Sequence, residues 1–209
     1  MVKVLVASNN PGKLRELEEV LRELDIAGVE LVSLRDVEPY PEPKEDGLTF
    51  EDNALIKARA GAARTGLPCV ADDSGLAVTA LNGMPGVLSA RWSGDHDADD
   101  ADSANNRLLL AQMQDIELRD AAFISCCALV TPAGDEFTAT GRWPGQLLRE
   151  PQGEGGFGYD PLFAPDDAQP ADATRPVSSA ELTPEEKNAR SHRGQALRAL
   201  APDIARLLG

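Results

Sequence analysis

Cysteine and histidine are scarce in this chain, and their scarcity argues against two kinds of site. The three cysteines, Cys69, Cys126 and Cys127, all lie in apolar segments. An odd count with two adjacent members argues against a disulfide framework, so we expect reduced, buried thiols. With two histidines and no Cys-x-x-Cys pair, a zinc site is not expected. Any metal should therefore be bound by oxygen, which indicates Mg²⁺ or Mn²⁺.

Long apolar runs and excess positive charge are also missing. No run of about 18 apolar residues occurs, so no membrane span is expected. The chain opens on a strand pattern rather than a signal peptide. The balance of 20 basic and 35 acidic residues gives a net charge of −15, which disfavours nucleic acid and anionic membranes as partners. We therefore expect a cytoplasmic protein that binds a small molecule, with positive charge concentrated locally if that molecule is an anion.

The order of periodic segments predicts an α/β fold with a mixed sheet and flanking helices. A length of 209 residues fits one domain, or two lobes around a cleft. Capping boxes at Thr49 and Thr183 predict the starts of two helices. Strands and helices follow one another without strict alternation, which favours a mixed sheet. Strands are expected at 2–7, 31–34, 68–71, 76–80, 122–130, 136–140 and 162–163, and loops at 94–102 and 165–176.

The segment from Ala71 to Leu76 is the most informative in the chain. Two adjacent acids, Asp72 and Asp73, follow an apolar run, and Ser74 with Gly75 is expected to turn the chain. Buried carboxylates are costly unless cations or donors compensate them. Neighbouring strand residues point to opposite faces, so one Asp can reach a ligand while the other holds the turn. This arrangement suits a hard metal ion and phosphoryl chemistry, although a solvated Asp-Ser-Gly turn is the simpler alternative.

A turn from Ser8 to Lys13 joins the first strand to the first helix. Pro11 fits a first helical turn, and Gly12 lets the backbone approach a ligand closely. A helix start with Lys13 beside it favours phosphate. The Walker A pattern is absent, and an ordinary capped turn with a solvated lysine remains open.

Acids and a lysine surround the second predicted helix. Glu45 and Asp46 precede it and could complete a carboxylate site with Asp73, or could serve only as partners of the helix dipole. Asn53 and Lys57 lie four residues apart and therefore share a helix face. Lys57 is a candidate for phosphate binding, with a surface lysine as the alternative.

Two later segments suggest recognition of a base. Residues 155–163, Gly-Gly-Phe-Gly-Tyr-Asp-Pro-Leu-Phe, interleave glycine with aromatic residues in a chain that has only nine aromatics. Phe157 and Tyr159 offer rings for stacking, and Asp160 offers an acceptor, unless the segment is a turn that packs into the core. Lys187 and the Ser191–Gly194 segment supply donors suited to a purine, or simply form a basic helix junction.

Five motifs together resemble one family, the non-canonical purine nucleoside triphosphate pyrophosphatases (inosine/xanthosine triphosphate pyrophosphatases, Ham1/RdgB-like). They are Ser-Asn-Asn-Pro-Gly-Lys, Ala-Asp-Asp-Ser-Gly-Leu, Pro-Gly-Val-Leu-Ser-Ala-Arg (85–91), Gly-Gly-Phe-Gly-Tyr-Asp-Pro and Ser-His-Arg-Gly, in that order along nearly the whole chain. The resemblance implies one elongated α/β domain over residues 1–209, with two lobes around a central cleft and usually a homodimer. It also implies Mg²⁺-dependent hydrolysis of ITP, dITP and XTP to the monophosphate and pyrophosphate, with Mn²⁺ as a possible substitute.

The resemblance also implies roles for individual residues. Asp73 would be the general base and a metal ligand, with Glu45 as the second ligand. As a base beside a metal, Asp73 should have a depressed pKa and be ionised at neutral pH. The residues implied to contact substrate are Ser8, Asn9, Asn10, Pro11, Gly12 and Lys13 for the triphosphate, Ser74, and Phe157, Gly158, Tyr159, Asp160, Lys187, His192 and Arg193 for the base.

Two other functions stay open from the sequence. A Maf-like pyrophosphatase acting on other nucleotides would have a similar fold, but the segments around Phe157 and His192 weigh against it. A nucleotide sensor without turnover is the second alternative, and the joint presence of Asp73, Glu45 and Lys13 argues against it.

Overall fold

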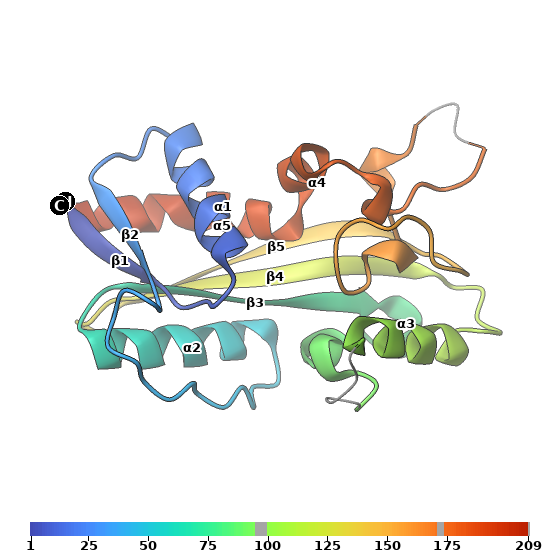
Figure 1. Ribbon diagram of the computed structural model, residues 1–209, viewed down its shortest axis with the longest axis horizontal. Helices are drawn as coiled ribbons and strands as arrows, with labels where there is room; N and C mark the ends of the chain where they lie inside the picture. The colour runs from blue at the N-terminus through green and yellow to red at the C-terminus, as the bar shows by residue number, and fades with distance from the viewer. Residues whose placement is uncertain (95–99, 171–173, 209) are drawn as a thin grey trace. The chain divides into compact units, whose positions relative to one another are not determined.

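The computed structural model describes residues 1–94, 100–170 and 174–208, in which six strands form one mixed sheet (Figure 1). The strand order is β2-β1-β3-β4-β5-β6. Strand β1 (Val2–Val6) pairs in parallel with β2 (Val29–Ser33) and with β3 (Cys69–Val78). Strand β4 (Asp120–Val130) lies between β3 and β5 (Glu136–Leu147), and β5 pairs antiparallel with β6 (Phe163–Pro165). The predicted mixed α/β fold is therefore confirmed.

Two α-helices begin at the capping boxes predicted from the sequence. Helix α2 (Phe50–Thr65) begins at the Thr49–Asp52 capping box, and α4 (Pro184–Arg190) begins at the Thr183–Glu186 box. In each box two backbone N–H groups that the helix leaves without a partner are satisfied by side chains. The other helices are α1 (Pro11–Glu23), α3 (Ala101–Gln112) and α5 (His192–Ala205).

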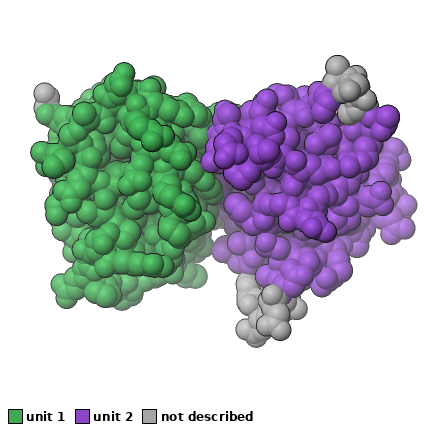
Figure 2. Space-filling view, turned by 45° about the horizontal axis from the view of Figure 1, so that its top comes forward, with its two compact units in different colours: residues 1–73, 125–141, 192–209 green, residues 74–124, 142–191 purple. Residues whose placement is uncertain are grey.

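The chain divides into two compact units, which Figure 2 shows in different colours. Unit 1 comprises residues 1–73, 125–141 and 192 onward. Its part of the sheet is covered by α1 and α5 on one face and by α2 on the other (Figure 1). The α2 face is made of small residues, and a Cβ added to Gly61 would lie 2.4 Å from the Cys69 sulfur. All three cysteines are buried free thiols, as predicted.

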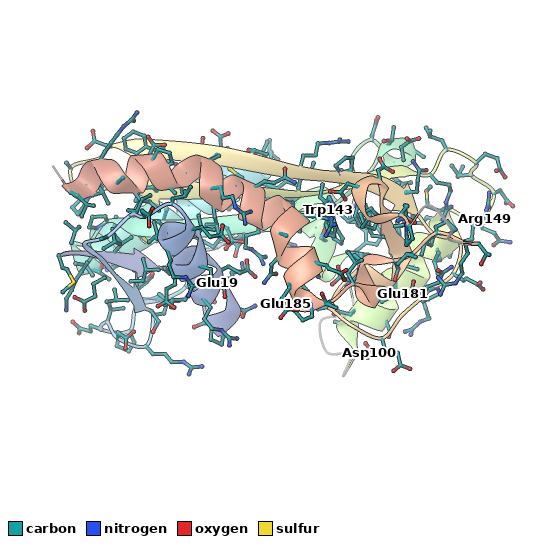
Figure 3. All side chains as sticks on the ribbon, turned by 90° about the horizontal axis from the view of Figure 1, so that it is seen from above. Glu19, Asp100, Trp143, Arg149, Glu181 and Glu185 are labelled. Carbon is teal, nitrogen blue, oxygen red and sulfur yellow. The ribbon has the colours of Figure 1, made fainter. Side chains whose placement is uncertain are left out.

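Unit 2 comprises residues 74–124 and 142–191 and has its own aromatic core. Trp143, labelled in Figure 3, is fully buried there. Its indole N–H donates to Asp167 at 2.7 Å. Phe163 packs edge-on against both Phe123 and Trp143. This core includes Leu147, at the end of β5, and Phe163, at the start of β6, and the segment 155–160 lies between these two residues in the chain.

The structure corrects two of the predicted strands. The predicted turn at Ser74 and Gly75 is absent, because β3 runs without interruption through both residues. Strand β5 extends to Leu147, past the predicted end at residue 140. Its exposed residues alternate with buried ones along that extension, which is the two-residue period of a half-buried strand.

Parts of the two predicted surface loops lie outside the described residues. Residues 95–99 belong to the loop predicted at 94–102, and residues 171–173 to the one at 165–176. In the described part of the chain, no helix is both long enough and apolar enough to cross a membrane.

Candidate active site

Strand β3 carries two adjacent carboxylates to opposite faces of the sheet in unit 1. Asp72 contacts residues of α1 and α5, whereas Asp73 contacts residues of α2. This is the alternation of side chains that any strand imposes. The interpretation of the two acids as a solvated turn is therefore wrong, and each acid has its own set of partners.

Asp72 forms a buried ion-pair group with two cations. One carboxylate oxygen lies 2.8 Å from the Lys13 ammonium, and the other accepts a hydrogen bond from Arg193 Nε at 3.1 Å. The Arg193 guanidinium also reaches Glu16 at 3.4 Å. Burial alone would raise the pKa of Asp72, but attraction to Lys13 and Arg193 outweighs it and holds that pKa well below its usual range. Asp72 is therefore ionised and fixes both cations in place.

Asp73 and Glu45 converge on a single ammonium group. Lys57 Nζ lies 3.0 Å from Glu45 Oε2 and 3.7 Å from Asp73 Oδ1. The second oxygen of Asp73 accepts a hydrogen bond from the Asn53 amide at 3.0 Å. Asn53 and Lys57 therefore share the helix face predicted from their spacing, and both of them approach Asp73.

The pKa of Asp73 is shifted in the direction opposite to that of Asp72. Burial raises the pKa of Asp73, and the attraction of Lys57 and the hydrogen bond from Asn53 offset that rise only in part. The depressed pKa expected for a base beside a metal is therefore not produced by the protein groups themselves. A carboxylate whose proton affinity is raised by burial is better suited to accept a proton from water.

The turn from Ser8 to Lys13 is held by its own side chains. Asn10 caps α1 by accepting from the Gly12 N–H at 2.8 Å, and its own N–H donates to Ser8 Oγ at 3.1 Å. The Lys13 N–H donates to the Asn10 carbonyl at 3.1 Å. The N–H groups of Gly12 and Lys13, in the first turn of α1, are therefore occupied within the turn.

The donor set beside Lys57 fits a hard divalent cation. Two carboxylates, Glu45 and Asp73, already surround one positive charge, and carboxylate oxygen is the ligand type that Mg²⁺ prefers. Within the described residues, no group of three or more His, Cys, Asp or Glu side chains could hold a metal ion. Mg²⁺ commonly takes one or two carboxylates and completes its coordination with water and substrate phosphates. Glu45 and Asp73 supply two such carboxylates.

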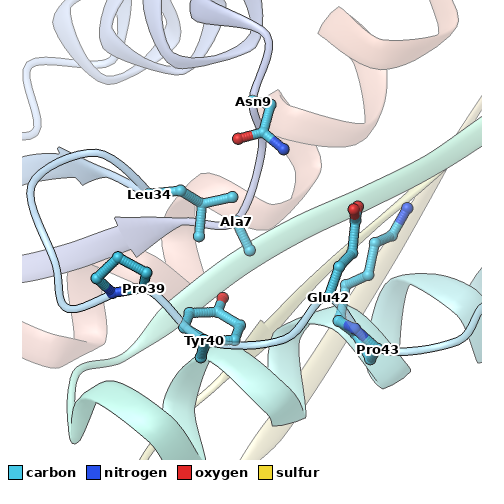
Figure 4. A pocket seen from close by; sticks show the side chains of 8 residues that line it. Ala7, Asn9, Leu34, Pro39, Tyr40, Glu42 and Pro43 are labelled. Atoms are coloured by element: carbon cyan, nitrogen blue, oxygen red, sulfur yellow. The ribbon is translucent and has the colours of Figure 1, made fainter.

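A pocket of about 230 Å³ adjoins Lys57 in unit 1 (Figure 4). It extends from the β1–α1 turn, where Asn9 lines it, to the loop that precedes α2. Its lining residues are Ala7, Asn9, Leu34, Pro39, Tyr40, Glu42, Pro43 and Lys57. Two members, Asn9 and Lys57, were singled out from the sequence for phosphate binding, and the pocket places them on one surface.

In unit 2, the segment 155–160 is folded around the carboxylate of Asp160. Asp160 is buried, and its oxygens accept from the Phe157 N–H and from Ser179 Oγ, each at 2.8 Å. The Lys187 ammonium also pairs with Asp160. The acceptor that the sequence suggested for a base or ribose is thus used inside the protein, where it shapes the loop.

The two aromatic rings of this segment have different environments. Tyr159 is buried and donates its hydroxyl to the Ser89 carbonyl at 2.9 Å, so its ring offers no exposed stacking face. Phe157 is 64% exposed, with the Lys187 ammonium 4.8 Å from its ring centre. Gly158, between them, donates to Asp102 and accepts from Asn106. Phe157 is therefore the ring of this segment that can stack on a ligand.

The remaining residues predicted to contact substrate are Ser74, His192 and Arg193. Ser74 continues β3 directly after Asp73, and His192 is the first residue of α5. Arg193 was expected beside Lys187 in a base site, but its guanidinium instead pairs with Asp72 and Glu16. Sequence reasoning missed this because Arg193 and Asp72 are 121 positions apart and no local pattern links them. It also missed Ser179, which has no motif around it.

Comparisons with known proteins identify the family of the chain. A family model described as the Ham1 family matches residues 4–203. The chain belongs to the Ham1 family. Among its relatives, a dITP/XTP pyrophosphatase of Nocardia farcinica is 61% identical over 99% of this chain and 97% of the relative. A dITP/XTP pyrophosphatase of Corynebacterium efficiens is 62% identical over the full length of both.

Solved structures of Ham1 relatives have the same fold. One, from Mycobacterium abscessus, is described as a nucleoside-triphosphatase / dITP/XTP pyrophosphatase. It is 60% identical with a TM-score of 0.79, covering 97% of this chain and 100% of that one. A HAM1 protein from Coxiella burnetii is 38% identical with a TM-score of 0.85, covering 99% and 100%. The Ham1 membership inferred from the five motifs is therefore confirmed.

Proposed function

We propose that this chain is a Mg²⁺-dependent nucleoside triphosphate pyrophosphatase that hydrolyses ITP, dITP and XTP to the monophosphate and pyrophosphate. The observation that carries the proposal is the convergence of Glu45 and Asp73 on Lys57, in a chain about 60% identical to dITP/XTP pyrophosphatases. Paired carboxylates with adjoining lysines are what phosphoryl transfer from a metal-bound triphosphate needs.

Asp73 is the general base in this proposal. Its Oδ2 is held by Asn53, and its Oδ1 faces Lys57, so the carboxylate has a fixed orientation toward an attacking water. The water loses its proton to Asp73 as its oxygen bonds to the α-phosphorus, and the bond from that phosphorus to the bridging oxygen breaks. When bound by Glu45 and Asp73, Mg²⁺ would neutralise charge on the phosphate oxygens.

Lys13 and Lys57 bind the phosphates. Both ammonium groups are paired with carboxylates, and because each has three N–H donors it can bind a phosphate oxygen while it keeps its carboxylate partner. Arg193 holds Asp72 and through it the position of Lys13. The leaving pyrophosphate is stabilised by these cations, which offset the overall charge of −15 locally.

The base is recognised in unit 2 by Phe157 and Lys187. Phe157 supplies a stacking face, and the Lys187 ammonium donates to the O6 carbonyl oxygen that hypoxanthine and xanthine share. Adenine carries an amino group at that position, which cannot accept a hydrogen bond from an ammonium group. A mismatch of this kind is worth as much as about 10⁴-fold in selectivity.

The proposal extends to assembly and location. We infer that the protein is cytoplasmic, because its three cysteines are buried free thiols. We also infer a homodimer, because the family resemblance implies that assembly.

Hydrolysis of ITP in ¹⁸O-labelled water tests the reaction. Phosphorus NMR should show pyrophosphate and IMP, with the ¹⁸O in IMP because water attacks the α-phosphorus. Asp73→Asn should abolish this turnover while sparing ITP binding. Formation of IDP and orthophosphate would refute the proposed reaction, and near-normal turnover in Asp73→Asn would remove that residue from the role of base.

A further inference from the structure

Asn53 contacts the two segments that carry the proposed metal ligands. It is 1% exposed and sits in the first turn of α2. Its amide nitrogen donates to Asp73 Oδ2 at 3.0 Å, and its amide oxygen accepts from the Gly47 N–H at 2.9 Å. Gly47 is two residues after Glu45, so one side chain ties the Asp73 strand to the Glu45 loop.

The chemistry of the two partners determines which way the amide lies. The Gly47 N–H can only donate, and an ionised Asp73 carboxylate can only accept. Asparagine satisfies both at once, whereas aspartate would face Asp73 with a like charge and alanine would reach neither partner. Lys57, one turn later on α2, repeats the link by contacting Glu45 and Asp73 directly.

Gly47 fits this arrangement because it has no side chain. A Cβ at this position would lie 2.5 Å from Asp52 Cβ and 2.7 Å from Asn53 Oδ1. Contacts that short force the loop away from α2. Asp52 holds the same loop by accepting from the N–H groups of Leu48 and Thr49, at 3.1 Å and 3.0 Å.

We propose that Asn53, with Gly47 as its partner, is a positioning residue that sets the separation of Glu45 and Asp73 and so determines the affinity of the pair for a divalent cation. This inference rests on the proposed function for its catalytic consequence, but not for the metal affinity itself. Side chains that orient metal ligands typically contribute about 10- to 100-fold to affinity.

The test measures Mn²⁺ binding and Mg²⁺ activation in Asn53→Ala and Gly47→Ala. The loss of the free Mn²⁺ electron paramagnetic resonance signal reports binding without any turnover. Both variants should bind Mn²⁺ about tenfold more weakly. Both should also need about tenfold more Mg²⁺ for half-maximal hydrolysis of ITP, with the KM for ITP nearly unchanged at saturating Mg²⁺.

Asn105→Ala provides the matched control. Asn105 is a helical asparagine in unit 2, 2% exposed, that accepts from the Ser93 N–H and donates to the carbonyls of Ser89 and Ala90. Its loss should lower the melting temperature but leave Mn²⁺ affinity at the wild-type value. If Asn53→Ala and Gly47→Ala behave in the same way as this control, Asn53 is merely structural and the inference is overturned.

The two proposals fail separately in this design. A wild-type protein that binds Mn²⁺ but does not hydrolyse ITP refutes the proposed function. The positioning role is then tested by the Mn²⁺ affinities of the variants alone. An active wild type whose Asn53→Ala variant has unchanged Mn²⁺ affinity refutes the positioning role alone. Gly47→Ala keeps the test decisive if Asn53→Ala does not fold, because it leaves the asparagine in place.

Discussion

At the scale of single residues, Asp72 and Asp73 show how position alone separates two identical side chains. Both are largely buried, which raises the proton affinity of any carboxylate. Asp72 has Lys13 and Arg193 against its two oxygens, so its pKa falls, whereas Asp73 has only Lys57 at 3.7 Å and a neutral amide, so its pKa rises. Asp72 therefore serves as a structural anion, and Asp73 is left as the candidate base.

Replacing each acid by asparagine should change stability in opposite directions. A pKa raised by folding costs stability above that pKa, so Asp73→Asn should melt higher than wild type at neutral pH, and the difference should vanish as the pH falls through the raised pKa of Asp73. A pKa lowered by folding gives stability that is present above the unfolded value and lost in acid. Asp72→Asn should therefore melt lower at neutral pH, with a deficit that shrinks below about pH 4.

Thermal melts in EDTA over a pH series check this pair of predictions, because EDTA removes any metal contribution. Equal melting temperatures of Asp73→Asn and wild type at neutral pH would show that burial does not disfavour the Asp73 charge.

Arg193 contributes to the stability of unit 1 as well as to its site. Its side chain is 10% exposed and is paired with Asp72. Arg193→Ala should lower the free energy of unfolding by about 3 kcal/mol, because breaking one arm of a buried ion pair leaves the other partner poorly compensated. Arg198→Ala is the control on the same helix. Arg198 pairs with Glu23 at 35% and 50% exposure, so its loss should cost about 0–1 kcal/mol.

Urea denaturation of both variants measures the difference. Equal, small losses for Arg193→Ala and Arg198→Ala would mean that the Asp72–Arg193 pair adds little to the stability of unit 1.

At the scale of secondary-structure elements, features set by residues close in sequence could be predicted, whereas features set by contacts between distant residues could not. The Thr49 and Thr183 capping boxes give the starts of α2 and α4 directly, because a cap involves residues only three apart. The predicted turn at Ser74-Gly75 was wrong because turn-forming residues also occur inside strands where the backbone is closely packed. A Cβ on Gly75 would lie 2.2 Å from Ser89 Oγ, a contact that no local pattern reveals.

The same distinction holds for the candidate site. Strand alternation predicts that Asp72 and Asp73 lie on opposite faces of the sheet. Helix spacing predicts that Asn53 and Lys57 share a face of α2. Both patterns are local properties of the sequence. The pairing of Arg193 with Asp72 and the enclosure of Asp160 by Ser179 and Lys187 depend on tertiary contacts between distant segments. Local patterns therefore predicted that Asn53 and Lys57 share a helix face, whereas the surroundings predicted for Arg193 and Tyr159 differ from those in the structure.

The segment 155–160 should bind the base through Phe157 alone among its aromatic residues. Phe157→Ala should weaken ITP binding by about tenfold, because stacking a base on an aromatic side chain is worth about 1–3 kcal/mol. Its ring is 64% exposed, so the free energy of unfolding should change by less than about 0.5 kcal/mol. Calorimetric titration of the Asp73→Asn background with ITP measures this without turnover.

Leu118→Ala is the control for an exposed apolar side chain in unit 2, at 48% exposure. It should leave ITP affinity unchanged. Equal ITP affinities for Phe157→Ala and the control would place base stacking elsewhere.

At the scale of the whole molecule, the chain should form a homodimer. Light scattering coupled to size-exclusion chromatography should give twice the chain mass of 22.2 kDa. A net charge of −15 per chain disfavours close approach of two copies at low salt, so the dimer should strengthen as ionic strength rises toward about 0.15 M. A mass of a single chain at every salt and protein concentration would contradict this prediction.

The central claim is that the whole protein releases pyrophosphate selectively from deaminated purine nucleotides. The most direct test is pyrophosphate release from ITP, XTP, dITP, GTP and ATP, each with Mg²⁺ and with EDTA. The account predicts rapid release from the first three with Mg²⁺, little from GTP or ATP, and none from any nucleotide with EDTA. Equal rates on all five nucleotides, or release of orthophosphate in place of pyrophosphate, would contradict it.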